Sequence, residues 1–123
     1  MAKLVLIVDD DPTQRRILEE TIKRLGYETK TAQGGEQALQ ILDGPDGAAI
    51  ALVLLDLVMP GMDGVETLDR LRELRPDLPV AICSGYDESQ VAPRFAGRKV
   101  QGFVKKPFTA QRILAAAAAL AGD

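Results

Sequence analysis

Short apolar runs alternate with longer amphipathic segments along the chain. The runs at residues 3–8 and 50–55 have the length and composition of buried β-strands. Between such runs, apolar residues recur at helical spacing, which predicts amphipathic helices. The remaining expected strands are 27–31, 79–83 and 100–105, and the expected helices are 11–26, 34–44, 63–75, 87–95 and one that begins at Thr109. Pro93 interrupts the fourth helix and makes its register the least defined.

Five strand–helix units predict a parallel sheet with helices on both faces, because right-handed crossovers place the connecting helices there. We therefore expect an α/β fold of the flavodoxin-like type. It would be a (βα)5 three-layer sandwich with strand order 2-1-3-4-5, formed by residues 1–123 as one domain. Ligands of such sheets bind at the carboxyl ends of the strands, where the winding direction reverses.

The amino-acid composition excludes several classes of functional site. The chain has 15 Lys+Arg, 18 Asp+Glu and no histidine, which gives a formal net charge of −3. Without histidine, zinc sites of the HExxH type, Ser-His-Asp or Cys-His catalysis and histidine-ligated haem are excluded. The acidic balance argues against a nucleic-acid partner, because phosphate backbones require a basic face.

The apolar runs are too short for a membrane span. The longest, residues 113–121, falls well below the roughly 20 residues that cross a bilayer. No basic segment precedes an apolar stretch at the N-terminus, as a secretory signal would require. We therefore expect a cytoplasmic location and no membrane partner. The single cysteine, Cys83, excludes an intrachain disulfide and is interpreted as an inert core residue.

Polar residues follow four of the expected strands. They are Asp9 and Asp10, Asp56, Ser84 and Lys106. Two carboxylates about 4 Å apart repel each other by roughly 4 kcal/mol at an effective dielectric of 20, so a cluster of three should bind a cation or take up a proton. An oxygen-only cluster favours a hard divalent ion such as Mg²⁺.

A lysine and a hydroxyl beside such a cluster point to phosphoryl transfer. The ammonium group of Lys106 suits a phosphoryl oxygen, and Ser84 offers a hydroxyl donor. An aspartate can act as the nucleophile and form an aspartyl phosphate. A metal ion and the lysine would then neutralise charge in the transition state.

Four segments of the sequence resemble the receiver domains of bacterial two-component response regulators. They are LIVDDDP at residues 6–12, LDLVMPGMDG at residues 55–64, Ser84-Gly85 and Lys106-Pro107-Phe108. Each segment alone is a weak match, but the four occur in the right order at the ends of the expected strands. The resemblance extends over essentially all of the chain.

The resemblance implies a metal site and a phosphoacceptor. Asp56 would be the phosphoacceptor. Mg²⁺ would be held by Asp9, Asp10, Asp56 and the backbone carbonyl of Val58, with Asp10 and Asp56 as direct ligands and Asp9 acting largely through water.

The resemblance also implies how phosphorylation is read out. Ser84 and Lys106 would contact the phosphoryl group, and the bond between Lys106 and Pro107 would be cis. Ser84 and Phe103 would form the switch, with Ser84 moving toward the phosphate and Phe103 turning inward. The face formed by helix 4, strand 5 and helix 5 would then change its affinity for a downstream protein.

A receiver domain of this kind accepts its phosphoryl group from a sensor histidine kinase or a histidine phosphotransferase. It is not an enzyme toward other substrates, because it catalyses only its own phosphorylation and dephosphorylation. Ser84-Gly85-Tyr86 and residues 102–108 resemble receivers of hybrid sensor histidine kinases in particular. The chain is therefore expected to be either a stand-alone regulator or a domain excised from such a kinase.

Other functions remain as alternatives. A pseudo-receiver would use the same fold as a protein-protein interaction module without being phosphorylated. A flavodoxin-type electron carrier needs a hydroxyl- and glycine-rich loop where this chain has Asp9-Asp10-Asp11. A phosphatase of the haloacid dehalogenase type needs an aspartate two residues after the nucleophile, where Val58 stands.

Several residues also have simpler interpretations. Ser84 would serve as a plain helix cap, and Phe103 as an ordinary core aromatic residue. The arginines of the third helix, Arg70, Arg72 and Arg75, are predicted to form a solvated helix face.

Overall fold

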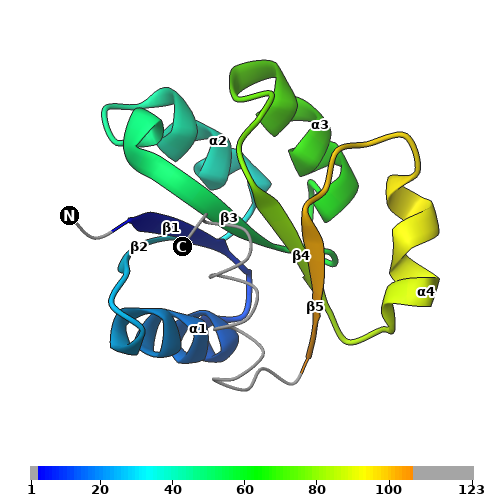
Figure 1. Ribbon diagram of the computed structural model, residues 1–123, viewed down its shortest axis with the longest axis horizontal. Helices are drawn as coiled ribbons and strands as arrows, with labels where there is room; N and C mark the ends of the chain where they lie inside the picture. The colour runs from blue at the N-terminus through cyan, green and yellow to red at the C-terminus, as the bar shows by residue number, and fades with distance from the viewer. Residues whose placement is uncertain (1–2, 107–123) are drawn as a thin grey trace.

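Five parallel strands form one sheet in the order β2-β1-β3-β4-β5 in the computed structural model, which describes residues 3–106 (Figure 1). The strands are β1 (Leu4–Val8), β2 (Glu28–Ala32), β3 (Ile50–Asp56), β4 (Val80–Ser84) and β5 (Gly102–Lys105). The helices are α1 (Pro12–Arg24), α2 (Gly35–Asp43), α3 (Gly64–Leu74) and α4 (Glu88–Val91), with 3₁₀ turns η1 (Gly47–Ala49) and η2 (Ala92–Phe95). The predicted flavodoxin-like strand order is confirmed.

Helices cover both faces of the sheet, and this explains the continuously apolar strands. On β1, Val5 and Ile7 pack with α1, whereas Leu6 and Val8 pack on the opposite face with α2 and α3. In Figure 1, α1 lies below the sheet, α2 and α3 lie above it, and α4 lies beside β5. Because each face has its own apolar cluster, strand residues are buried whichever way they point.

The fourth helix differs from its prediction. Residues 87–95 form two short pieces, α4 and the 3₁₀ turn η2, rather than one helix. Pro93 lies inside η2, and a proline lacks the N–H that a continuing α-helix needs. The expected helix from Thr109 and the expected cis bond between Lys106 and Pro107 fall outside the described residues.

The prediction of a solvated arginine face on α3 is wrong for Arg72 and Arg75. Arg72 donates to the carbonyl of Leu78 at 2.6 Å and to that of Lys99 at 2.7 Å. Arg75 donates to the carbonyl of Gly47 at 2.7 Å. These guanidinium groups fasten the end of α3 to the segments that precede β3, β4 and β5 by charge-assisted hydrogen bonds to backbone carbonyls.

Replacing Arg72 with methionine should therefore destabilise the fold by about 2 kcal/mol, because partly buried carbonyls lose charged donors. The matched control is Arg70→Met on the same helix, where the arginine pairs with Glu66 on the exposed face, at 3.3 Å. That control should change stability by less than about 0.5 kcal/mol. Urea unfolding followed by circular dichroism measures both, and equal losses would contradict a structural role for Arg72.

Within residues 3–106, no helix combines the length and the apolar character that a membrane span needs.

Candidate functional site

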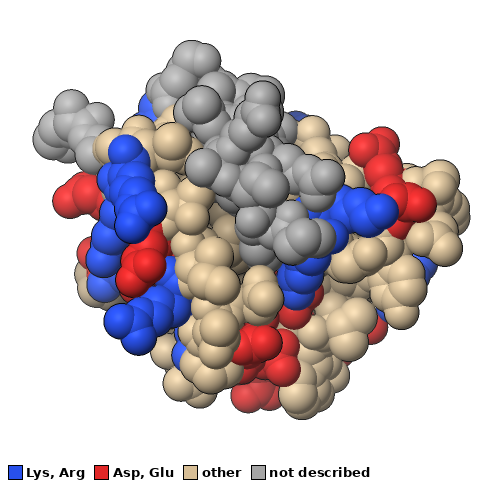
Figure 2. Space-filling view, turned by 90° about the horizontal axis from the view of Figure 1, so that it is seen from below, with Lys and Arg blue, Asp and Glu red and all other residues tan. Residues whose placement is uncertain are grey.

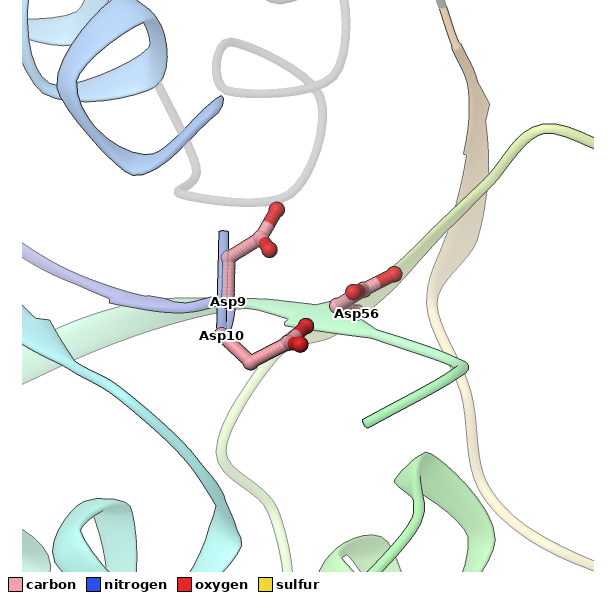
Figure 3. A group of neighbouring side chains, drawn as sticks. All are labelled: Asp9, Asp10 and Asp56. Atoms are coloured by element: carbon pink, nitrogen blue, oxygen red, sulfur yellow. The ribbon is translucent and has the colours of Figure 1, made fainter. Parts of the chain in front are cut away.

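Three carboxylates meet where β1 and β3 end. Asp9 and Asp10 follow β1, and Asp56 is the last residue of the neighbouring β3, whose Leu55 pairs with Val8. One oxygen from each carboxylate lies within 4.8 Å of the others (Figure 3). Asp9 is 1% exposed and Asp56 is 5% exposed, whereas Asp10 faces solvent.

Hydrogen bonds on three sides hold Asp9. Its backbone N–H donates to the carbonyl of Ala32 at 3.1 Å, and its Oδ1 accepts from the N–H of Asp11 at 2.9 Å. Its carbonyl accepts from Nη1 of Arg15 at 2.8 Å. The other carboxylate oxygen, Oδ2, is buried without a hydrogen-bond partner among the described residues. A buried carboxylate oxygen without a donor is a position that a cation or its water would satisfy.

Asp56 sits at a tight junction between β3 and α3. A Cβ atom on Gly64 would lie 2.8 Å from the carbonyl oxygen of Asp56, so only glycine lets α3 begin this close to the strand end. The backbone N–H of Gly64 donates to the carbonyl of Leu57 at 2.9 Å and fixes this approach. The glycine of the Asp63-Gly64 pair therefore has a packing reason to lie just after the site.

The electrostatics of Asp56 favour proton uptake when no cation is bound. Burial, together with repulsion from Asp9 and Asp10, raises the pKa of Asp56 to about 6, although Lys106 opposes the shift. In the folded protein, the ionised form of this carboxylate is therefore less stable than it is in water. Such a group gains from any positive charge brought to it.

Lys106 reaches the carboxylates from the end of β5. Its backbone N–H donates to the carbonyl of Ser84 at 2.7 Å, which places it beside β4. Its Nζ lies 3.1 Å from Oδ1 of Asp56 and 3.7 Å from Oδ2 of Asp9. Burial alone would lower the pKa of Lys106, but the charges of Asp56 and Asp9 outweigh it and raise that pKa. The side chain is therefore a fixed positive charge next to Asp56.

Ser84 lies on the same rim, at the end of β4. It is buried, and its Oγ accepts the N–H of Tyr86 at 3.0 Å. The residue that caps α4 is Asp87, whose side chain and that of Gln90 form a capping box, so Ser84 is not the helix cap. Among residues 3–106 no acceptor takes its hydroxyl proton, so the hydroxyl can donate to a group bound next to Asp56.

Val58 and Phe103 occupy different surroundings. The side chain of Val58, two residues after Asp56, is 64% exposed at the edge of the site. Phe103 on β5 is half-buried and meets the ring of Phe95 edge-on, with 6.2 Å between centroids. Phe103 and Ser84 both line a cavity of about 140 Å³ between β4, β5 and α4.

The residues present fit a hard divalent cation. The cluster offers carboxylate oxygens only, and Mg²⁺ prefers one or two carboxylates with further oxygen ligands. Oδ2 of Asp9 also supports a cation here, because it is buried without a hydrogen bond from the described residues and Nζ of Lys106 comes no nearer than 3.7 Å. Cys83 lies near the cluster on β4, but burial and the charge of Asp56 raise the pKa of its thiol, which keeps it protonated and out of the ligand set.

Sequence reasoning missed Arg15, which contacts the backbone beside the acidic cluster. Nothing in the sequence pattern marks it, because the contact joins a side chain on α1 to a carbonyl six residues earlier. Its neighbour Arg16 is exposed and pairs with Glu20 at 3.5 Å. In Figure 2, basic side chains gather at the left of the view with acidic ones among them, and a separate group of acidic side chains lies near the bottom centre.

Comparisons with known proteins identify a family and agree with the fold. A family model described as "Response regulator receiver domain" matches residues 5–118. The chain is 38% identical over 110 residues to the two-component response regulator ARR22 of Arabidopsis thaliana, an alignment that covers 89% of this chain and 77% of that protein. Among solved structures, the receiver domain of NtrX from Brucella abortus superposes with a TM-score of 0.84 at 33% identity, covering 97% of this chain and 99% of that one.

Longer proteins also contain a similar segment. The chain is 35% identical to the response regulator MprA of Mycolicibacterium vanbaalenii over 120 residues, which cover 94% of this chain and 49% of that protein. It is 36% identical to the sensor histidine kinase RcsC of Salmonella typhimurium over 106 residues, which cover 86% of this chain and only 11% of that protein. The chain therefore spans half or less of the length of these two relatives.

Proposed function

Because this chain belongs to the response regulator receiver family, we propose that it accepts a phosphoryl group on Asp56, from a sensor histidine kinase or a histidine phosphotransferase, in a reaction that requires Mg²⁺. The observation that carries the proposal is the pairing of a buried carboxylate with a lysine. Oδ1 of Asp56 lies 3.1 Å from Nζ of Lys106, beside two further carboxylates. This arrangement combines a nucleophile, a fixed positive charge and a cation-binding cluster.

Each residue has a defined part in the transfer. An oxygen of Asp56 forms the bond to phosphorus while the bond from phosphorus to the donor atom breaks. Lys106 donates to a phosphoryl oxygen and holds it in place, and Ser84 donates its hydroxyl proton to another. Asp9, Asp10, Asp56 and the carbonyl of Val58 would hold Mg²⁺. The ion would neutralise negative charge on the phosphoryl oxygens.

The switch that we propose links Ser84 to Phe103. Both border the cavity of about 140 Å³ between β4, β5 and α4, so a shift of Ser84 toward the phosphoryl group would make room for the ring of Phe103. Packed interiors respond to such changes by moving between discrete arrangements. A downstream protein would bind at the face of α4 and β5, which the resemblance extends to the helix expected from Thr109, outside the described residues.

The proposal extends to the domain boundaries, the substrate range and the location of the protein. Receiver domains are signalling domains, and we propose that this one, formed by residues 1–123, acts on no substrate other than its own aspartyl phosphate. A cytoplasmic location fits the reduced, buried thiol of Cys83. The relatives differ in the parts that accompany the receiver, so we propose no specific kinase partner.

Incubation with acetyl phosphate tests the proposal. In the presence of Mg²⁺, intact-mass measurement should show the gain of one phosphoryl group, and chelation with EDTA should prevent it. Hydroxylamine should remove the label, because it cleaves acyl phosphates and spares phosphoserine. In a separate phosphorylated sample, borohydride reduction of the intact acyl phosphate followed by peptide mapping should locate the modification at Asp56. The absence of any mass gain under these conditions would favour a pseudo-receiver that acts by protein-protein interaction.

A further inference from the structure

One guanidinium group holds the backbone from which the acidic cluster projects. Arg15, in the first turn of α1, donates from Nη1 to the carbonyl of Asp9 at 2.8 Å. That carbonyl belongs to the peptide group that joins Asp9 to Asp10. Because a peptide group is planar, a bond to its oxygen also sets the plane that contains the nitrogen and Cα of Asp10.

We propose that Arg15 is a positioning residue for the divalent cation: it fixes the Asp9–Asp10 peptide and thereby aims the carboxylate of Asp10 at the site. The inference rests on the proposed function, because it concerns the same metal cluster. Arg15 itself contacts a carbonyl and not the ligand atoms, so its action is on the geometry of its neighbours.

The surrounding hydrogen bonds show why this contact matters. The N–H of Asp11 donates to Oδ1 of Asp9 at 2.9 Å, and the N–H of Arg15 donates to the carbonyl of Asp11 at 2.9 Å. These bonds secure the residues on either side of Asp10. Asp10 itself is exposed, so packing does not restrain its side chain. The peptide before it therefore sets the direction of the Cα–Cβ bond from which its carboxylate extends.

The charge of Arg15 and its contact with the Asp9 carbonyl should have opposite effects on the affinity for Mg²⁺. A positive group close to a cation site repels the cation, so removal of the charge alone should strengthen Mg²⁺ binding. Loss of the positioning contact should weaken it, as the loss of contacts that orient metal ligands generally does. The two effects have opposite signs, and a binding measurement separates them.

The experiment compares Mg²⁺ titrations of the whole chain by isothermal calorimetry. Arg15→Met should weaken Mg²⁺ binding by about 10-fold relative to the parent protein. The matched control is Arg16→Met, which removes the same charge from the next position, where the side chain is 79% exposed. The control should bind Mg²⁺ as tightly as the parent or slightly more tightly. A merely structural role would lower the melting temperature without changing the affinity of the folded protein, so all titrations are made where each variant is fully folded.

Each outcome has a distinct meaning. If Arg15→Met binds Mg²⁺ as tightly as Arg16→Met, or more tightly, the positioning role is overturned while the proposed function stands. If the parent protein does not bind Mg²⁺, the proposed function and the positioning role both fail. Arg15→Gln carries the same expectation and replaces the methionine variant should that variant not fold.

Discussion

Replacing Asp56 with asparagine is expected to abolish phosphorylation and, in the same protein, to increase stability. The amide has no carboxylate oxygen with which to form an acyl phosphate. The substitution also removes a negative charge whose burial, together with repulsion from Asp9, raises the pKa of Asp56 to about 6. A shift from 3.8 to about 6 corresponds to about 3 kcal/mol of destabilisation at neutral pH. We expect the variant to be more stable by only about 1–2 kcal/mol, because burying the amide of asparagine also costs free energy.

Two measurements on the same samples check this prediction. Intact mass after incubation with acetyl phosphate and Mg²⁺ reports phosphorylation, and urea unfolding in EDTA reports stability. The matched control is Asp77→Asn, an exposed aspartate that pairs with Lys99 at 2.7 Å, remote from the acidic cluster. It should be phosphorylated like the parent and should not gain stability. A phosphorylated Asp56→Asn variant would show that another residue accepts the group.

The pH dependence of stability follows from the same shift. Because the pKa of Asp56 is higher in the folded protein than in the unfolded chain, the folded form binds more protons between about pH 6 and pH 4. The destabilising contribution of Asp56 is therefore complete above pH 6 and disappears as the pH falls through this window. In EDTA, the parent should gain stability relative to Asp56→Asn as the pH falls. Parallel curves for the two proteins would contradict the raised pKa.

The sheet and the placement of the candidate residues were predictable because strong local signals agreed with the topology. Continuous apolar runs mark strands that are buried on both faces, and parallel topology then puts all their carboxyl ends on one edge. Asp9, Asp56 and Lys106 therefore had to come close together wherever the strands began. The structure differs in detail, since Asp56 and Ser84 end their strands rather than follow them.

The roles of three arginines could not be predicted. Arg15, Arg72 and Arg75 each reach a backbone carbonyl that only the folded chain brings near. Hydrophobic periodicity describes which face of a helix is buried, but a long side chain can leave a polar face and cover distant backbone. The prediction of one helix over residues 87–95 was wrong for a different reason. The helical pattern there is weak, and Pro93 interrupts it, so the backbone forms a 3₁₀ turn instead.

The geometry separates two contributions to the proposed reaction, cation binding and stabilisation of the phosphoryl group. Arg15 contacts the backbone of the acidic cluster, whereas Lys106 points its Nζ at the nucleophile. Both side chains are positively charged, and both lie close enough to repel a cation. Only Lys106 is placed to touch a phosphoryl group on Asp56. Its replacement should therefore affect chemistry and binding in opposite directions.

Lys106→Met is accordingly expected to slow phosphorylation by acetyl phosphate by about 100-fold, the cost of losing one charged donor to the transition state. Mg²⁺ binding should remain as tight as in the parent or become tighter, because a competing positive charge 3.1 Å from Asp56 is gone. Lys105→Met is the matched control. That lysine is the preceding residue, and its Nζ pairs with Asp87 at 2.5 Å, at the exposed end of α4.

The rate of mass gain and the calorimetric Mg²⁺ affinity together decide between two roles for Lys106. A slow rate with intact Mg²⁺ binding places the ammonium group on the phosphoryl oxygens. A rate and an affinity that fall together would mean that Lys106 instead holds Asp9 and Asp56 in position, as a counter-charge without which the cluster rearranges. An unchanged rate would remove Lys106 from the reaction altogether, since the lysine would then compensate the buried charge of Asp56 only in the resting protein.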